Sequence, residues 1–301
     1  MLFKKLIVSL FLIPSFLLGI MPMTASADTI ASAQHRLELL EQIQKLMAQV
    51  VLLQKQLEGK PGYSLVSSSV IQNRTPYQLQ FYNFPHEAIY YVDEGKLVNS
   101  DPARGVGNIA QGLFNLFKAV VGEQVVQQSV NEWRIFNNKE SDIGAYVELM
   151  ATTENGERNW VVGVNREGFD ISSTKSFANL FVHEYGHVLL YDYKDFVNNF
   201  KDSFWTAEDI RHQERVVKTS GDKRFSLTKD YYEDNKQRFV SDYATNSFDE
   251  DLAETFVYFI REDKPIGNTI RDQKIRTFYQ ESDLVEKRTQ IRANLRGLGV
   301  L

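Results

Sequence analysis

The most constraining feature of this sequence is an apolar stretch that carries two of the chain's five histidines. The residues at 172–174 are good N-cap residues, and they predict a helix that runs from there to about Tyr191. Seven large apolar residues make this helix largely apolar: Phe177, Leu180, Phe181, Val182, Val188, Leu189 and Leu190. A helix of this kind belongs in a core, and polar side chains that are buried with it need partners.

The two histidines stand in His183-Glu-Tyr-Gly-His187, an H-E-x-x-H sequence. A spacing of four puts both imidazoles on one helix face, where they can share a tetrahedral Zn²⁺ ion. Glu184 is turned toward the adjoining face, where it can hold a zinc-bound water and take its proton as general base. A chance match on an amphipathic helix is the alternative, and it leaves two buried imidazoles without a partner.

A third zinc ligand is needed, and the composition restricts its type. The chain has no cysteine, which excludes a thiolate ligand, disulfides, iron–sulfur chemistry and a cysteine nucleophile. His212 falls in a charged segment, 210–215, that is typical of a solvated helix, and neither His35 nor His86 has a partner at ligand spacing. The sequence therefore favours a carboxylate as the third ligand.

The best carboxylates lie in a segment with helical periodicity, residues 249–260. Glu250 and Glu254 are one turn apart, on a stripe next to the apolar side of that helix. One carboxylate can bind zinc while the other holds the free N–H of a zinc-bound imidazole. We assign Glu250 as the ligand, with Glu254 as the main alternative. Ser247-x-x-Glu250 also fits a capping box, in which Glu250 would only reach back to the helix start.

H-E-x-x-H followed by a downstream glutamate helix resembles the gluzincin branch of zinc metallopeptidases. The stretch 243–254 is similar to the corresponding segment of the peptidase domain of anthrax toxin lethal factor, and the resemblance covers residues 173–256. The site residues that it implies are His183, His187 and Glu250 as ligands of one zinc ion, Glu184 as general base, Glu254 against an imidazole, and Tyr243 at the oxyanion. The residues alone do not separate Tyr243 from Tyr231 or Tyr232.

The order of the predicted elements indicates an α+β fold. Segments 143–150 and 159–164 are strand-like and are joined by a turn-rich link, which predicts a hairpin. A helix is expected over 106–130, and the chain after Lys194 is expected to be mostly helical. The resemblance implies a zincin-like domain over residues 61–301, with a small mixed sheet over the H-E-x-x-H helix. In that family an extended peptide pairs with a strand edge, and 159–164 is either that edge or an ordinary buried strand.

The N-terminal region predicts export and a separate helix. Two lysines, an apolar run and Ala25-Ser26-Ala27 indicate a signal peptide over residues 1–27, cleaved after Ala27, with an uncleaved membrane anchor as the alternative. No other apolar run is long enough to span a membrane. Residues 28–60 predict an amphipathic or coiled-coil helix, and the heptads within 30–57 serve either self-association or packing on the chain's own domain.

The formal net charge of −5 argues against nucleic acid as the main partner. Together these features predict a secreted zinc-dependent endopeptidase that hydrolyses peptide bonds of a peptide or protein substrate through a zinc-bound water. A catalytically silent, zinc-stabilised protein is one alternative, although such a site has no use for Glu184. A cell-surface adhesion or scaffold protein that acts through its coiled coil is the other.

Overall fold

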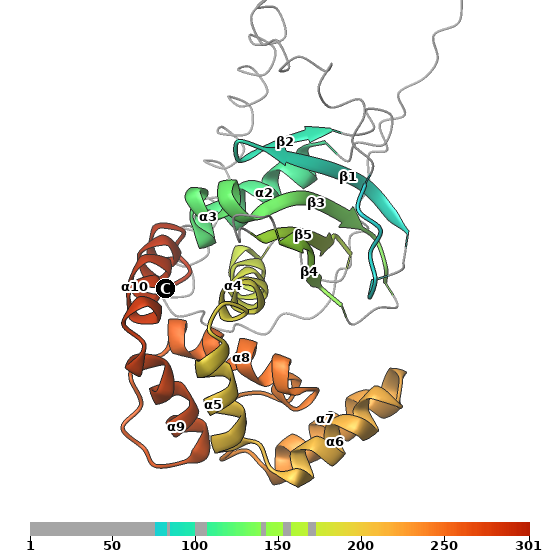
Figure 1. The fold of residues 1–301 in the computed structure, drawn as a ribbon. Coiled ribbons are helices and arrows are strands. Elements are labelled where there is room, and N and C mark those ends of the chain that lie inside the picture. Colours follow the sequence, from blue (N-terminus) through green and yellow to red (C-terminus); the bar gives the residue numbers. More distant parts are fainter. Residues whose placement is uncertain (1–75, 83–84, 100–106, 140–142, 153–157, 168–172) are drawn as a thin grey trace, which may run out of the picture. The chain divides into compact units, whose positions relative to one another are not determined.

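The computed structural model describes residues 76–82, 85–99, 107–139, 143–152, 158–167 and 173–301. All of them belong to the second of the two units into which the chain divides, residues 68–301. The predicted signal peptide and the predicted coiled-coil helix lie outside the described residues. The described part is a mixed α+β structure with one five-stranded sheet and nine α-helices, so the α+β prediction is confirmed (Figure 1).

The sheet contains parallel and antiparallel strands. Its strands are β1 (His86–Asp93), β2 (Lys96–Asn99), β3 (Val130–Phe136), β4 (Ala145–Thr152) and β5 (Arg158–Asn165), in the spatial order β2-β1-β3-β5-β4. Strands β3 and β5 pair in parallel, and the other neighbours are antiparallel. The predicted hairpin is present as β4 and β5, in which Val147 lies opposite Val162.

Of the two interpretations of 159–164, the ordinary buried strand is confirmed and the strand edge is wrong. This segment is β5, which pairs with β3 on one side and β4 on the other, so its main-chain groups are already used. Its continuous run of buried residues is typical of an interior strand covered on both faces. Among the described strands, β4 is the edge on this side of the sheet.

The helix predicted over 106–130 is two helices followed by a strand. Helix α2 (Asn108–Val121) ends at Gly122, and α3 (Glu123–Ser129) follows directly and leads into β3. Gly122 has φ 104°, a backbone conformation that favours glycine, so the chain changes direction there. Apolar residues of α2 pack on the face of the sheet that α4 also covers. There the ring centroids of Phe117, Trp133 and Phe181 lie 5.3–6.1 Å apart.

The H-E-x-x-H helix is α4 (Thr174–Leu190), close to the predicted range. Ser173 caps it, with the Oγ atom accepting a hydrogen bond from Ser176 N at 3.2 Å. Helix α4 packs against α2, β4 and α8 (Phe248–Arg261), and Figure 1 shows it between the sheet and α8. A Cβ atom at Gly186 would lie 3.2 Å from the Phe256 ring and 3.5 Å from Ala253 Cα. The glycine therefore permits the close approach of α4 and α8.

The rest of the described chain is mostly helical, as predicted. The helices are α5 (Lys194–Phe204), α6 (Ala207–Val217), α7 (Gly221–Asp234), α8, α9 (Ile270–Thr277) and α10 (Ser282–Gly297), with 3₁₀ turns η2 (Tyr243–Thr245) and η3 (Phe278–Gln280). Helix α8 packs against α4, α9, α10 and η2, which makes it the central helix of the part of the chain after Lys194 (Figure 1). No helix in the described ranges has the length and apolar character needed to cross a membrane.

Candidate metal centre

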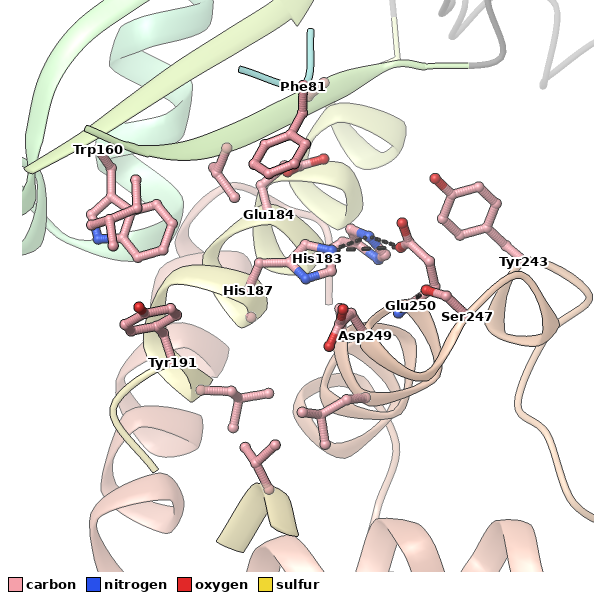
Figure 2. Close-up of a pocket in the computed structure, with 18 of the residues that line it drawn as sticks. Phe81, Trp160, His183, Glu184, His187, Tyr191, Tyr243, Ser247, Asp249 and Glu250 are labelled. Carbon is pink, nitrogen blue, oxygen red and sulfur yellow. Dashed lines mark hydrogen bonds and ion pairs between the residues drawn. The ribbon is translucent and has the colours of Figure 1, made fainter. Parts of the chain in front are cut away.

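Helices α4 and α8 bring three ligand-type atoms to one point. His183 Nε2 lies 3.0 Å from Glu250 Oε2, and His187 Nε2 lies 3.5 Å from the same oxygen. The two Nε2 atoms are 3.1 Å apart. Figure 2 shows the two imidazoles and the Glu250 carboxylate turned toward one another on the wall of a cavity. Within the described ranges this is the one group of histidine and acidic side chains that could hold a metal ion.

The spacing of these atoms fits a tetrahedral zinc site. Two ligands that are each about 2.0–2.1 Å from a tetrahedral ion lie about 3.3–3.4 Å apart. The three observed separations, 3.0, 3.1 and 3.5 Å, are close to that value. Glu250 Oε2 is also buried and accepts no hydrogen bond of good geometry from the described residues. A cation would supply the partner that this oxygen lacks.

Glu254 orients one of the imidazoles. Its Oε1 atom lies 2.8 Å from His183 Nδ1, and its Oε2 atom accepts a hydrogen bond from Ser241 Oγ at 2.6 Å. An ionised carboxylate can only accept hydrogen bonds, so the hydrogen sits on Nδ1. A neutral His183 then points the lone pair of Nε2 at Glu250 Oε2. Two acceptors at that distance repel each other unless a proton or a metal cation lies between them. A carboxylate that holds the outer N–H of an imidazole, as Glu254 does here, is the usual partner of a metal-ligating histidine.

The charges of the chain support the same conclusion. Burial lowers the pKa of His183, but the carboxylates of Glu250 and Glu254 outweigh this effect and raise the pKa well above its usual value. Burial raises the pKa of Glu250, but the imidazoles of His183 and His187 lower it by more, to below its usual range. The cluster therefore favours a positive charge at its centre. In the metal-free chain a proton on the His183 imidazole supplies that charge, and a metal cation would take the place of the proton.

The Glu250 side chain is used at this cluster and not at the helix start. Ser247 caps α8 by accepting a hydrogen bond from Glu250 N at 3.2 Å, which is the first half of a capping box. The Glu250 carboxylate lies against the two imidazoles instead of returning to the Ser247 backbone. Of the two candidate acids, Glu250 reaches both Nε2 atoms, whereas the described contact of Glu254 with the imidazoles is at Nδ1 of His183.

Glu184 is buried and lies beside the three converging atoms. It lines the same cavity of about 840 Å³, and Figure 2 shows it on the strand side of His183 and His187. Burial raises the pKa of Glu184, while the two histidines lower it by less. A carboxylate with a raised pKa is a stronger base than one in water.

The opposite walls of the cavity come from β4, with Ala145, Val147 and Leu149, and from α8.

Tyr243 lines the cavity from the α8 side. It belongs to η2, its ring meets the His183 ring edge-on with centroids 5.6 Å apart, and it is partly exposed (Figure 2). The Tyr231 hydroxyl instead donates a hydrogen bond to Asp209 at 2.7 Å, and neither Tyr231 nor Tyr232 lines the cavity. Of the three tyrosines that the sequence left open, Tyr243 is the one brought to the metal-type cluster.

The remaining histidines lie elsewhere. The interpretation of 210–215 as a solvated helix is wrong for His212, which is buried and stacks on the Tyr231 ring with centroids 3.8 Å apart. The rest of the expectation holds, because the side chains of Glu208, Arg211 and Arg215 on the same helix are 50–61% exposed. His86 Nε2 contacts the Tyr146 hydroxyl at 2.6 Å, and His35 lies outside the described residues.

Sequence reasoning missed Phe81, which lines the cavity from the strand side (Figure 2). It comes from the segment 76–82, far before α4 in the chain, and the only signal at hand was the aromatic character of that region.

Comparisons of the chain with known protein families, with curated proteins and with solved structures find no match.

Proposed function

We propose that this protein is a zinc-dependent endopeptidase of the gluzincin type, with a zincin-like fold. The observation that carries the proposal is the convergence of His183 Nε2, His187 Nε2 and Glu250 Oε2 at separations of 3.0–3.5 Å. Zinc is the ion that suits two imidazoles and one carboxylate in a tetrahedral arrangement with one open position. Zinc bound there would activate a water molecule and polarise the carbonyl group of a peptide bond.

The residues around the three ligands have the properties that peptide hydrolysis requires. In the proposed reaction Glu184 would take a proton from the attacking water and pass it to the leaving amine as the C–N bond breaks. Burial raises the pKa of Glu184, which makes it a stronger base than a carboxylate in water. Tyr243, on the opposite wall, is a hydrogen-bond donor of the kind that stabilises negative charge developing on the carbonyl oxygen.

The strand β4 suggests how a peptide substrate would lie. It is an edge of the described sheet, and its residues Ala145, Val147 and Leu149 line the cavity that contains Glu184. An extended peptide can add to such an edge through main-chain hydrogen bonds. A cavity that is open to a substrate also favours an enzyme over a silent, purely structural zinc site, which closes with a fourth protein ligand.

Export is part of the proposal. The signal-peptide pattern of residues 1–27 supports secretion, with cleavage after Ala27. Mass spectrometry of the N-terminus of the exported protein tests this prediction. A first residue of Asp28 supports secretion, whereas an intact Met1 on membrane-bound protein supports the anchored form.

The decisive test of the activity compares wild type with Glu184→Gln. We expect one zinc ion per chain in both proteins, because Glu184 is not a ligand. Cleavage of a mixed peptide library should fall by about 10²–10⁴-fold in the variant, since general-base catalysis contributes that much. A wild-type protein that takes up no zinc, or zinc-loaded protein whose cleavage is unaffected by the substitution, would contradict the proposal.

A further inference from the structure

The segment 76–82 wraps from the outer face of the sheet toward the proposed active site. Side chains alternate along β3 and β4, so Glu132 and Glu148 point away from α4, whereas Val147 and Leu149 face the cavity. Tyr77 N donates a hydrogen bond to Glu132 Oε1 at 2.8 Å on that outer face. At the other end of the segment, Phe81 and Tyr82 line the cavity, and Figure 2 shows the Phe81 ring there.

Strong contacts hold the segment in place directly before and after Phe81. Gln80 N and Phe81 N donate to the two carboxylate oxygens of Glu148 at 2.7 and 3.3 Å, and Glu148 itself is buried. The Tyr82 ring stacks on the Tyr146 ring with centroids 4.3 Å apart. Two backbone donors on one buried carboxylate, together with a ring stack, fix where the Phe81 side chain can go.

The Phe81 side chain itself is exposed to solvent. It is 78% exposed although its neighbours are anchored, and Figure 2 shows its ring on the strand side of the cavity, close to Glu184. Covering an aromatic ring of this exposure with another apolar group is favourable, because it removes apolar surface from water. The cavity continues along apolar residues of β4, α4, α5 and α8: Val147, Leu149, Leu190, Val197 and Leu252.

We propose that Phe81 is a substrate-contact residue that binds an aromatic or large aliphatic side chain of an extended peptide lying along β4. This inference rests on the proposed peptidase function. The segment is a permanent wall of the site and not a removable inhibitory piece. Its release would strip the buried Glu148 carboxylate of two backbone partners, which is strongly unfavourable.

The test compares wild type, Phe81→Ala and Phe81→Trp as zinc-loaded full chains on a peptide library that varies the residues around the cleaved bond. We expect Phe81→Ala to lower kcat/KM by about 10-fold for peptides with an aromatic or large aliphatic residue at one subsite, the scale of one aromatic contact. The loss should lie mostly in KM, since the ring does not act on the reacting atoms. Phe81→Trp should retain the preference, and the zinc content should stay unchanged.

Phe225→Ala is the matched control, because Phe225 is also an exposed phenylalanine, at 61%, and does not line the cavity. It should cleave the library with the wild-type profile. Phe81→Ala with a wild-type profile and normal zinc content would overturn the inference. If the wild type binds zinc but cleaves nothing, binding of the same peptides is measured instead. Binding that depends on Phe81 keeps the substrate contact and rejects the peptidase, and binding that ignores Phe81 rejects both.

Discussion

Two neighbouring acids on α8 show two ways of keeping a carboxylate away from water. Asp251 is fully buried, and its Oδ2 atom accepts hydrogen bonds from Lys274 Nζ at 2.6 Å and from Trp205 Nε1 at 2.8 Å. Glu250, one residue earlier, has its ion pairs within the described residues with the imidazoles of His183 and His187. The first carboxylate has a permanent cation from the chain, and the second has groups that bind cations.

This difference separates a structural ion pair from a site for an added ion. A buried lysine balances Asp251 within the folded chain, so the stability that this pair contributes needs no ligand. The described ion pairs of Glu250 and Glu254 are all with histidine, whose charge depends on protonation. We therefore expect the Asp251 side of α8 to be independent of zinc, and the Glu250 side to depend on it.

The largest expected effect comes from breaking the structural pair. Lys274→Met leaves the Asp251 carboxylate buried without its cation and should lower the free energy of unfolding by about 3–5 kcal/mol. The loss should be the same with and without zinc, because Lys274 is not at the metal-type cluster. Urea unfolding followed by circular dichroism measures it.

The matched control replaces both partners at once. Asp251→Leu combined with Lys274→Met removes both buried charges, and it should recover most of the stability that the single variant loses. A double variant as unstable as the sum of its single changes would mean that the two charges are not coupled. Asp251 and Lys274 would then not be a structural ion pair, and the contrast with Glu250 would fail.

The second effect is the loss of stabilisation by zinc. At free zinc one hundred times the dissociation constant, the wild type should gain about 2.7 kcal/mol of unfolding free energy. Glu250→Gln removes the anionic ligand and should gain almost nothing under the same conditions. Thermal unfolding across a zinc titration measures both. Asp249→Asn is the control, since Asp249 lines the cavity on the same helix but lies outside the ligand cluster. A zinc response that persists in Glu250→Gln and vanishes in Asp249→Asn would show that the ligand is misassigned.

The smallest effect concerns the partner of the imidazole. Glu254→Gln keeps the shape of the side chain but removes the charge that faces His183 Nδ1. Zinc affinity should fall by about 10–100-fold, as is usual for the outer partner of a ligating histidine. Competition with a fluorescent zinc chelator measures the change. An affinity loss larger than that of Glu250→Gln would exchange the roles of the two glutamates.

Features that depend on local sequence were predictable. The Ser173 cap and the apolar periodicity give α4 nearly at its observed bounds, and the i, i+4 spacing puts His183 and His187 on one face. Glu250 and Glu254 followed in the same way from their periodicity beside an apolar stripe. These properties arise within one or two helical turns, so they can be predicted without knowledge of the tertiary fold.

Features that depend on distant parts of the chain were not predictable. Whether 145–152 or 159–164 forms the sheet edge depends on the parallel pairing of β5 with β3, which lies far earlier in the sequence. The burial of His212 depends on the Tyr231 ring of a different helix. Phe81 is held at the cavity by distant partners of its segment, because Glu148 accepts hydrogen bonds from Gln80 N and Phe81 N and the Tyr146 ring stacks on Tyr82.

The most direct test of the proposed zinc site is anomalous diffraction at the zinc absorption edge from crystals of the zinc-loaded protein. We predict one anomalous peak among His183 Nε2, His187 Nε2 and Glu250 Oε2, at about 2.0–2.2 Å from each, with Glu254 remaining on His183 Nδ1. A peak elsewhere in the protein, or no peak from protein that was saturated with zinc, would contradict the central claim.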